Sequence, residues 1–221
     1  IGLFAPYGLT TEWPDQFEGR FLGYKSKIQA IYIQPTAAVK LGTRARIGAG
    51  FDFSLVSVQL RQRLELSAQT AAPGVTFANL GIPYGTEFGD VNLHGHGSGV
   101  GYHVGLQVEP INHVTLGARY LSRQLVKINN ATADIAQIMT GIVLPANNPV
   151  TLNPSTGTGP AVPVDGLLAP QFGTGGPLNN QGGSTYLRLP EQLVVGISWQ
   201  ATPRARLLAD FQYTNWTVFN Q

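Results

Sequence analysis

The chain has 221 residues, enough for one all-β domain. Only 12% of the residues are charged, and the net charge of +2 is too small to indicate a nucleic-acid partner. No stretch approaches ~18 continuous apolar residues, which excludes a transmembrane helix, and the lack of cysteine excludes a disulfide framework and thiol chemistry. Few charges without a long apolar run are typical of a transmembrane β-barrel, in which lipid-facing and lumen-facing residues alternate.

A proline interrupts the first strand pattern. The segment Ala5-Pro6-Tyr7-Gly8 places a residue without a backbone N–H in an otherwise extended stretch. Proline in a sheet is confined to edges, bulges or kinks. The segment is therefore either a kink within a strand or the end of a strand that enters a loop.

Two strands are predicted on either side of a tight turn at Gly42-Thr43. Residues 30–41 alternate between apolar and polar side chains, and the alternation resumes at Ala45. Beyond Leu55 it changes phase, so either a β-bulge is inserted there or the strand has left the membrane and shows an apolar face to the lumen. The run to about Leu66 spans roughly 70 Å at ~3.3 Å per residue, well beyond the ~25 Å apolar band of an outer-membrane barrel. The apolar residues after the phase change are Val56, Val58 and Leu60.

The next predicted loop, 67–98, leads to the clearest strand pattern of the chain. In residues 99–109 every second residue is apolar, and the opposite face carries glycine, histidine, glutamine and glutamate. A short turn at 110–112 precedes a strand over 113–128. In that strand Arg119 is expected to face inward, and Leu121 and Leu125 are expected to be apolar residues of the lumen.

A second long loop, 129–184, dominates the rest of the chain. Its stretch Ala133–Leu144 has apolar residues at helical spacing, which predicts a short helix. Strands are predicted over 186–199 and 204–219, joined by a turn at 201–203. Short and long connections therefore alternate, and outer-membrane barrels place short turns on the periplasmic side and long loops outside. The sequence predicts an all-β, antiparallel transmembrane β-barrel with two long extracellular loops rather than a soluble sandwich.

Several stretches of the chain, in this order, resemble the FadL/TodX family of outer-membrane transporters of long-chain fatty acids and aromatic hydrocarbons. They are A-P-Y-G-L-T-T-E-W (5–13), I-Q-P-T-A-A-V-K-L (33–41), R-I-G-A-G-F-D-F (46–53), G-Y-H-V-G-L-Q-V-E-P (101–110), V-T-L-G-A-R-Y-L-S (114–122), L-R-L-P-E-Q-L-V-V-G (187–196) and Y-T-N-W-T-V-F (213–219). The resemblance implies a roughly fourteen-stranded barrel with an N-terminal hatch. Residues 1–221 would then be one partial transmembrane β-barrel domain, from the end of the third strand through the ninth, without the hatch and the C-terminal strands.

Both ends of the chain agree with an internal fragment, because Ile1 is not an initiator methionine and no terminating signal precedes Gln221. The resemblance also implies a function for the proline segment. In the family, an inward kink of the third strand opens a gap through which apolar cargo leaves sideways into the lipid, and Ala5, Pro6, Tyr7 and Gly8 fall at the position of that kink.

The predicted ligand-binding residues are apolar side chains of the lumen together with cations on the same wall. Apolar residues suit a dehydrated route for a greasy ligand, and an arginine offers bidentate contacts to a carboxylate head group. The resemblance places a head-group arginine near Arg61 and Arg63. The alternative for each cation is a salt bridge on a neighbouring strand or contact with lipopolysaccharide. The full set is Val56, Val58, Leu60, Arg61, Arg63, Arg119, Leu121, Arg123 and Leu125, with Lys127 nearby.

Other motifs carry less chemistry. His94 and His96 alternate as in a strand, but the glycines around them predict a flexible loop end, and no metal site is expected. A nucleophile motif of the G-x-S-x-G type is absent, so no enzyme activity and no cofactor are predicted. The tryptophans are assigned to interfacial girdles. They are Trp13, Trp199 and Trp216.

The sequence thus predicts passive uptake of hydrophobic molecules, long-chain fatty acids or aromatic hydrocarbons, through a lumen pocket with lateral exit into the membrane. The expected partners are these small molecules, outer-membrane lipid and lipopolysaccharide, with no nucleic acid. The full-length barrel is expected to be a monomer in the outer membrane of a Gram-negative cell. The alternative is a structural or adhesive outer-membrane barrel that binds a partner through its loops.

Overall fold

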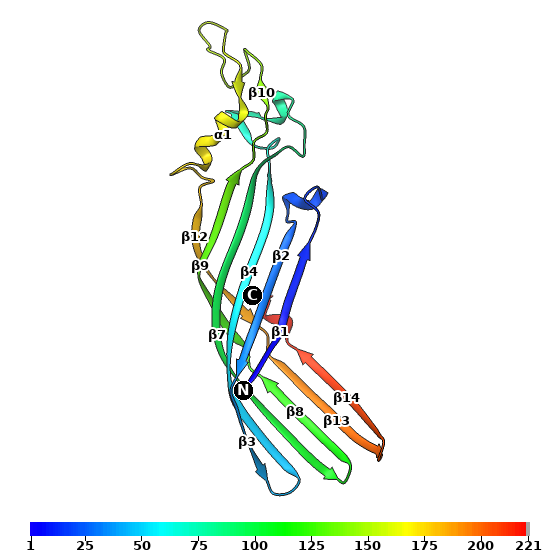
Figure 1. The fold of residues 1–221 in the computed structure, drawn as a ribbon. Coiled ribbons are helices and arrows are strands. Elements are labelled where there is room, and N and C mark those ends of the chain that lie inside the picture. The colour runs from blue at the N-terminus through cyan, green and yellow to red at the C-terminus, as the bar shows by residue number, and fades with distance from the viewer. Residues whose placement is uncertain (220–221) are drawn as a thin grey trace.

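A computed structural model describes residues 1–219, and strands form most of it (Figure 1). The strands of the main sheet are β1 (Gly2–Glu12), β2 (Lys25–Gln34), β3 (Thr36–Leu41), β4 (Ala45–Glu65), β7 (Glu87–Ile111), β8 (Val114–Leu121), β9 (Gln124–Gln137), β12 (Gln181–Leu189), β13 (Gln192–Thr202) and β14 (Ala205–Thr214). The remaining elements are short: η1 (Glu18–Phe21), β5 (Thr70–Ala72), β6 (Val75–Thr76), η2 (Ala78–Leu80), β10 (Val143–Leu144), β11 (Val162–Pro163), α1 (Val164–Phe172) and η3 (Trp216–Phe219).

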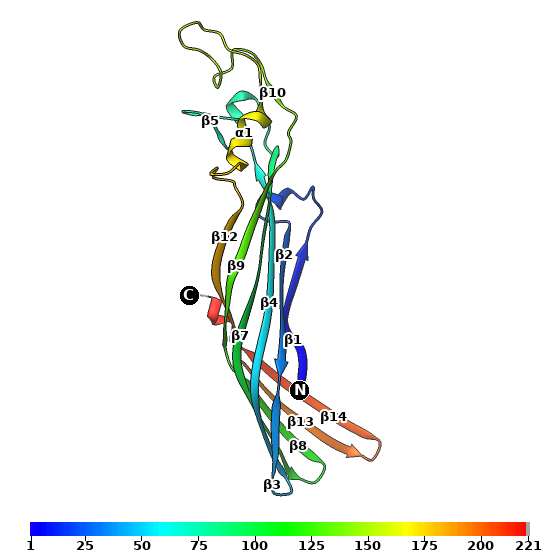
Figure 2. The same ribbon diagram turned by 60° about the vertical axis from the view of Figure 1, so that its left-hand side comes forward.

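The ten strands form one antiparallel sheet, which confirms the predicted all-β fold. The main path runs β1-β2-β4-β7-β8-β13-β14, and the upper half of β7 pairs instead with β9, which in turn pairs with β12. Short turns lie at one end of the sheet and long connections at the other, here called the turn end and the loop end (Figures 1 and 2). Within the described residues, no helix is long and apolar enough to cross a membrane.

Three predicted strands are each divided into two. Pro35 separates β2 from β3, and Pro190 lies between β12 and β13, because a residue without an N–H cannot continue the ladder. The third break, between β8 and β9, is made by Ser122, whose hydroxyl accepts the N–H of Tyr102 at 2.9 Å. By contrast, β4 and β7 run unbroken through both halves of the sheet.

The sheet curls around one face. Tyr7 on β1 donates its hydroxyl to the carbonyl of Pro190 at 2.7 Å, although these segments lie far apart in the strand order. The inner face carries Val56, which is buried, and the outer face carries exposed aromatics such as Phe51 and Phe53. An apolar exposed face opposite a buried one is the pattern of a curled sheet in lipid.

The register of β4 explains the change of phase beyond Leu55. The pairing of β4 with β7 keeps one register from Ala45 to Leu64, so no β-bulge lies at Leu55. The even residues of β4 stay on the inner face throughout, and only their character changes from polar Asp52 and Ser54 to apolar Val56 and Val58. The second alternative, an apolar face toward the interior, is therefore confirmed.

The predicted loop lengths and the helix need correction. Strand β7 begins at Glu87 rather than at residue 99, and β9 continues to Gln137, so the long connections cover 66–86 and 138–180. The helix predicted over Ala133–Leu144 is wrong, because its first residues extend the β9 ladder against β7. A helix forms later, over Val164–Phe172.

The two long connections pack against each other at the loop end. Their shared apolar core has seven buried residues. They are Leu66, Phe77, Ile82, Phe88, Leu144, Val164 and Leu168. Asp165 stabilises this core, because its carboxylate accepts hydrogen bonds from the backbone N–H groups of Thr140 and Gly141 at 2.7 and 2.9 Å.

Candidate ligand-binding site

An apolar cluster closes the middle of the inner face. Its buried members come from six strands, and we call it the inner cluster. Rings of Tyr7 and Tyr32 meet edge to face with centroids 6.1 Å apart, and Leu121 is fully buried beside them. The inner cluster comprises Tyr7, Ala30, Tyr32, Val56, Leu121, Val126, Ile128 and Leu189.

Two of the predicted apolar site residues belong to this cluster and a third packs against it. Val56 and Leu121 are buried members, and Val58 is partly buried against them. Leu60 shares their face of β4 but lies higher, 39% exposed. Leu125 is different, because the break at Ser122 reverses the alternation and places it on the outer face, 46% exposed, so the expectation that it faces the lumen is wrong.

Glycines on the inner face of β7 make room for the inner cluster. A Cβ atom at Gly97 would lie 2.5 Å from the carbonyl oxygen of Lys127 and 2.7 Å from Ile128, and one at Gly95 would lie 2.8 Å from Ile128. Glycine is required here because another strand approaches this closely.

Below the inner cluster, hydrogen-bonded polar side chains cross three neighbouring strands. We call them the polar row: Thr36 on β3, Asp52 on β4 and His103 on β7, with Gln34 beside Asp52. The imidazole of His103 on β7 lies over Gly50 on β4 and reaches Thr36 on β3, with Nε2 and Oγ1 2.8 Å apart. Its Nδ1 lies 2.7 Å from a carboxylate oxygen of Asp52, which is fully buried and also accepts a hydrogen bond from Gln34. Gly50 permits this arrangement, since a Cβ there would lie 2.6 Å from the imidazole.

The polar row opens onto a cavity of about 640 Å³ at the turn end. Thr36, His103 and Arg119 line its upper part, next to the inner cluster, and Arg46 and Asp210 line its wall. Arg119 faces inward, as predicted, because it pairs across the ladder with Gly105 of the inner face. Its guanidinium carbon lies 5.7 Å from the centre of the Phe4 ring, and it forms no ion pair with any residue from 1 to 219.

A second cavity, of about 390 Å³, lies above the inner cluster at the loop end. Apolar side chains from the β1–β2 connection and from the inner faces of β4 and β7 line it. They are Trp13, Leu22, Leu60, Val91 and Leu93. Trp13 stacks on Phe17 at 4.8 Å, so the structure places it at this cavity, whereas Trp199 lies exposed on the outer face.

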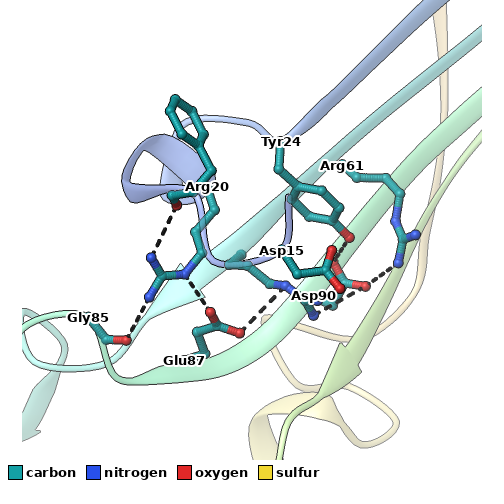
Figure 3. Close-up of polar contacts among 9 residues, drawn as sticks. Asp15, Arg20, Tyr24, Arg61, Gly85, Glu87 and Asp90 are labelled. Atoms are coloured by element: carbon teal, nitrogen blue, oxygen red, sulfur yellow. Dashed lines mark hydrogen bonds and ion pairs between the residues drawn. The ribbon is translucent and has the colours of Figure 1, made fainter. Parts of the chain in front are cut away.

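Arg61 and Arg63 do not share a face with the inner cluster. They occupy odd positions of β4, on the side of Phe53 and Leu55, and Tyr24 of the β1–β2 connection lies against both guanidinium groups. Figure 3 shows Arg61 beside Tyr24 and Asp90. Arg61 also lines the second cavity. Arg61 forms an ion pair with Asp90, and Arg63 contacts Glu87 at 3.5 Å and Asp90 at 3.6 Å.

The same group of charges encloses a tyrosine. Tyr24 donates its hydroxyl to Asp90 at 2.9 Å, and its ring lies under both guanidinium groups. Burial and the neighbouring Asp90 carboxylate raise the pKa of Tyr24 to about 12. Arg20 completes the network through Glu87 and the carbonyl of Gly85. These contacts are those expected of a structural ion-pair network that anchors the connection to the sheet.

The remaining predicted cations lie apart from the inner face. Arg123 sits at the break between β8 and β9 with a half-exposed side chain, 3.9 Å from Glu191. Lys127 is exposed on the outer face, opposite Ser98 of β7.

Strand β1 is irregular at the proline. The ladder with β2 shifts register between Phe4 and Tyr7, and β1 continues to Glu12. Ala5 and Pro6 therefore stand opposite the single residue Ile31, which makes a bulge with one extra residue within a strand, rather than the end of a strand that enters a loop.

His94 and His96 lie within β7, which corrects the predicted flexible loop end. They share the outer face, and His94 has Asp134 3.6 Å away. No group of three or more histidine, cysteine, aspartate or glutamate residues with metal-binding geometry occurs in residues 1–219.

Comparison with known proteins agrees with the fold of the sheet. The family model described as "Outer membrane protein transport protein (OMPP1/FadL/TodX)" matches residues 1–221. The chain belongs to the FadL/TodX family. A long-chain fatty acid transport protein from Escherichia coli O6:H1 (strain CFT073) is 25% identical over 221 residues, covering 97% of this chain and 44% of that protein. Members of this family are outer-membrane proteins of Gram-negative bacteria.

Solved structures of the FadL/TodX family share the fold. A Pseudomonas aeruginosa FadL homologue superimposes with a TM-score of 0.68 at 19% identity, over 98% of this chain and 45% of that one. The CymD monoaromatic hydrocarbon channel gives a TM-score of 0.57 at 16% identity, over 98% and 50%. A deletion mutant of the TodX monoaromatic hydrocarbon channel gives 0.55 at 18%, over 97% and 50%. The chain spans about half the length of these relatives.

Several residues of the site were missed by sequence reasoning. Tyr7 was assigned only to the kink and His103 only to the polar face of residues 99–109, and Asp52 was assigned no role. The sequence gives only a weak signal for the polar row. Thr36 and His103 are 67 positions apart in the sequence, and they meet only because Gly50 lies between them in the sheet. The pairing of the β3 hairpin with β4 and of β4 with β7 is needed to see it.

Proposed function

We propose that the protein containing this chain takes up hydrophobic molecules passively across the outer membrane, along the inner face of the sheet. The observation that best supports this proposal is a reversal of polarity between the two faces of β4 toward the loop end. There the inner face presents Val58 and Leu60, and the outer face presents Gln59 and Arg61. A water-filled pore would have the opposite arrangement.

The proposed route has three stages. Cargo first enters the loop-end cavity, where Trp13 and Leu22 offer exposed apolar surface. It then passes the inner cluster, which requires the Tyr7 ring to move away from Tyr32. Burial of apolar surface, ~25 cal/mol per Å², supplies the driving force without a cofactor.

The proposed exit lies at the bulge of β1. Ala5 and Pro6 interrupt the β1–β2 ladder next to Tyr7, so backbone groups that would otherwise pair are displaced at the level of the inner cluster. We place the lateral opening into the membrane there. Lipid and lipopolysaccharide are proposed to contact the outer face, where Lys127 is exposed.

Uptake of a radiolabelled fatty acid and of a labelled alkylbenzene tests the proposal, in cells with and without the full-length gene. We expect uptake of at least one cargo to depend on the gene. Equal uptake in both strains would refute transport.

The tightly packed inner cluster favours one alternative, a structural or adhesive barrel whose interior is closed. The variant Tyr7→Ala separates the two functions, because it opens the inner cluster beside the bulge. A transporter should retain or gain uptake with this variant. A closed barrel should show no gene-dependent uptake with either form.

A further inference from the structure

We propose that Lys127, Asn129 and His96, on the outer face of β7 and β9, form a binding site for a phosphate group of an outer-leaflet glycolipid of the lipopolysaccharide type. This inference rests on the proposed contact of the outer face with lipopolysaccharide, and it adds the residues and the chemical group that they bind. Both strands have a neighbouring strand on each side (Figures 1 and 2), so the site lies within the sheet and not at its edges.

The site lies where the outer face changes from apolar to polar. Leu55, Ser98 and Lys127 stand opposite one another on β4, β7 and β9 and mark a line across the sheet. On the turn-end side of this line, Val100 and Leu125 are 62% and 46% exposed on the outer face. On the loop-end side, the outer positions of the same strands are polar. The line is therefore one edge of the apolar band that faces lipid.

A β-bulge in β9 lies directly on the loop-end side of this line. The ladders of β9 with β7 and with β12 both shift register here, and Asn129 and Asn130 have no partner in either ladder. The residues on either side of them, Ile128 and Ala131, both pack inward at the inner cluster. Both asparagines are therefore turned to the outer face, where they are exposed.

The opposite strand holds the bulge in place. A Cβ atom at Gly95 of β7 would lie 2.8 Å from Ile128 and 3.2 Å from the Cα of Ala131, so the inner side of the bulge is packed directly against β7. The next residue of β7, His96, is exposed on the outer face beside the bulge. The bulge and His96 thus keep a fixed position relative to each other.

Four exposed side chains form the corners of the site. Ser98 stands opposite Lys127, and His96 and Asn129 lie two residues further toward the loop end on the same face. Neighbouring strands lie ~4.8 Å apart, and residues two apart along a strand are separated by roughly 7 Å. The site therefore has the size of one phosphate group, with an ammonium group for the charge and amide, hydroxyl and imidazole groups that donate hydrogen bonds. The unpaired backbone of the bulge supplies a further N–H donor.

The distribution of charge favours an anion at this level. Lys127 forms no ion pair within residues 1–219, and neither does Lys27 on the outer face of β2. The acid of β9 is Asp134, which lies further toward the loop end and 3.6 Å from His94. Lysines without a carboxylate partner thus lie just beyond the apolar band, whereas Arg61, closer to the loop end, is paired.

A lipid phosphate fits this position better than a free anion does. Lipopolysaccharide phosphates lie between the sugar head group and the acyl chains, at the edge of the apolar layer. Acyl chains of a glycolipid held at Lys127 would cover Val100 and Leu125, which are exposed directly below it. Burial of apolar surface then adds to the attraction between the ammonium group and the phosphate.

The test compares diphosphoryl lipid A with the same glycolipid after removal of both phosphates. Affinities are measured by thermophoresis on the full-length protein in detergent micelles, for Lys127→Gln, Lys127→Arg and Asn129→Ala. Lys127→Gln should weaken binding of diphosphoryl lipid A by about 5-fold, which corresponds to the upper value for an exposed ion pair, and should change binding of the dephosphorylated lipid by less than about 2-fold. Asn129→Ala should cause a loss of the same selectivity, and Lys127→Arg should keep the affinity of the parent protein.

The control variant removes the same charge outside the site. Lys40 is exposed near the turn end, beyond the far side of the apolar band, so Lys40→Gln should leave both affinities unchanged within about 2-fold. The β-sheet circular dichroism of each variant is compared with that of the parent protein, so that a folding defect is recognised. Inorganic phosphate at the concentration of the glycolipid should not displace it, because it lacks the acyl chains.

Several results would overturn the inference. They are equal losses for the two glycolipids, unchanged binding with both Lys127→Gln and Asn129→Ala, the same loss with Lys40→Gln, or displacement by inorganic phosphate. If the parent protein bound neither glycolipid, the proposed contact with lipopolysaccharide itself would fail. Uptake of cargo by cells that carry Lys127→Gln should match that of the parent, so the outcome for the phosphate site is independent of the outcome for transport.

Discussion

Substitution of Gly97 by alanine tests whether the close approach of β9 to β7 is required. A Cβ atom at this position would lie 2.5 Å from the backbone oxygen of Lys127, 2.7 Å from Ile128 and 2.9 Å from Val126. The first of these atoms belongs to a paired strand and cannot rotate away, so β9 must shift. Overpacking of this kind costs about 1–3 kcal/mol in the free energy of unfolding.

Gly105 provides the matched control on the same face of the same strand. A Cβ atom there would lie 3.7 Å from the oxygen of Ala118, an ordinary contact. Because glycine within a strand is less favourable than alanine by roughly 0.5–1 kcal/mol, Gly105→Ala should be neutral or stabilising. The glycine-to-alanine gain applies to both variants, so they should differ by the overpacking cost, about 1–3 kcal/mol, in urea unfolding of the full-length protein in lipid vesicles. Equal stabilities would refute the argument that Gly97 is required by the neighbouring strand.

Three further predictions concern the bulge, the arginines and the loop core. Deletion of Ala5 should restore the β1–β2 register and reduce uptake in cells, while the purified protein still binds cargo. Unchanged uptake would show that the bulge is not needed for the exit of cargo. Arg61→Gln should leave the affinities for decanoic acid and methyl decanoate unchanged within about 2-fold, because the guanidinium of Arg61, although it lines the loop-end cavity, is already paired with the Asp90 carboxylate. A selective loss of affinity for the acid would return the head-group role to Arg61. Asp165→Asn should increase amide exchange at Thr140 and Gly141 at neutral pH. Burial raises the pKa of the Asp165 carboxyl, but the hydrogen bonds from these residues outweigh burial and lower this pKa overall. The carboxylate therefore stabilises the loop core above the unfolded pKa of ~3.9, and this stabilisation is lost as the pH falls through the folded pKa. The difference between parent and variant should disappear in strong acid.

The sequence was most informative within strands that continue without a break. The alternation in residues 99–109 predicted the faces of β7, and the same pattern placed Arg119 inward, because a period of two follows directly from strand geometry. The length of β4 and the apolar inner face after Leu55 also followed from the pattern, once the alternative of a bulge is removed by the register.

Prediction failed where two strands of opposite phase follow each other. Residues 113–128 read as one strand, but the break at Ser122 reverses the alternation, so Leu125 lies outside although Leu121 lies inside. The polar row could not be predicted from the sequence for a related reason. It depends on which residues of β3, β4 and β7 stand opposite one another, and a single sequence does not contain that register. The helix over 133–144 was wrong because apolar spacing in a short segment fits a helix and a ladder end alike.

The breaks in the strands have a common position, and this position defines the site. Thr36 pairs with Gly50 and Gly50 with His103, so Pro35 lies beside Phe51 and Tyr102; Tyr102 in turn bonds to Ser122. On the far side, Leu121 pairs with Gln192, which places the Pro190 break on the same line across the sheet. Each break removes ladder hydrogen bonds at one level, while β4 and β7 remain continuous, so the sheet bends along this line without separating. The inner cluster lies on the loop side of the bend and the polar row and Arg119 lie at it. Along the proposed route, an apolar chain would therefore meet Arg119, which has no ion pair within residues 1–219, where the sheet changes direction beside the bulge of β1.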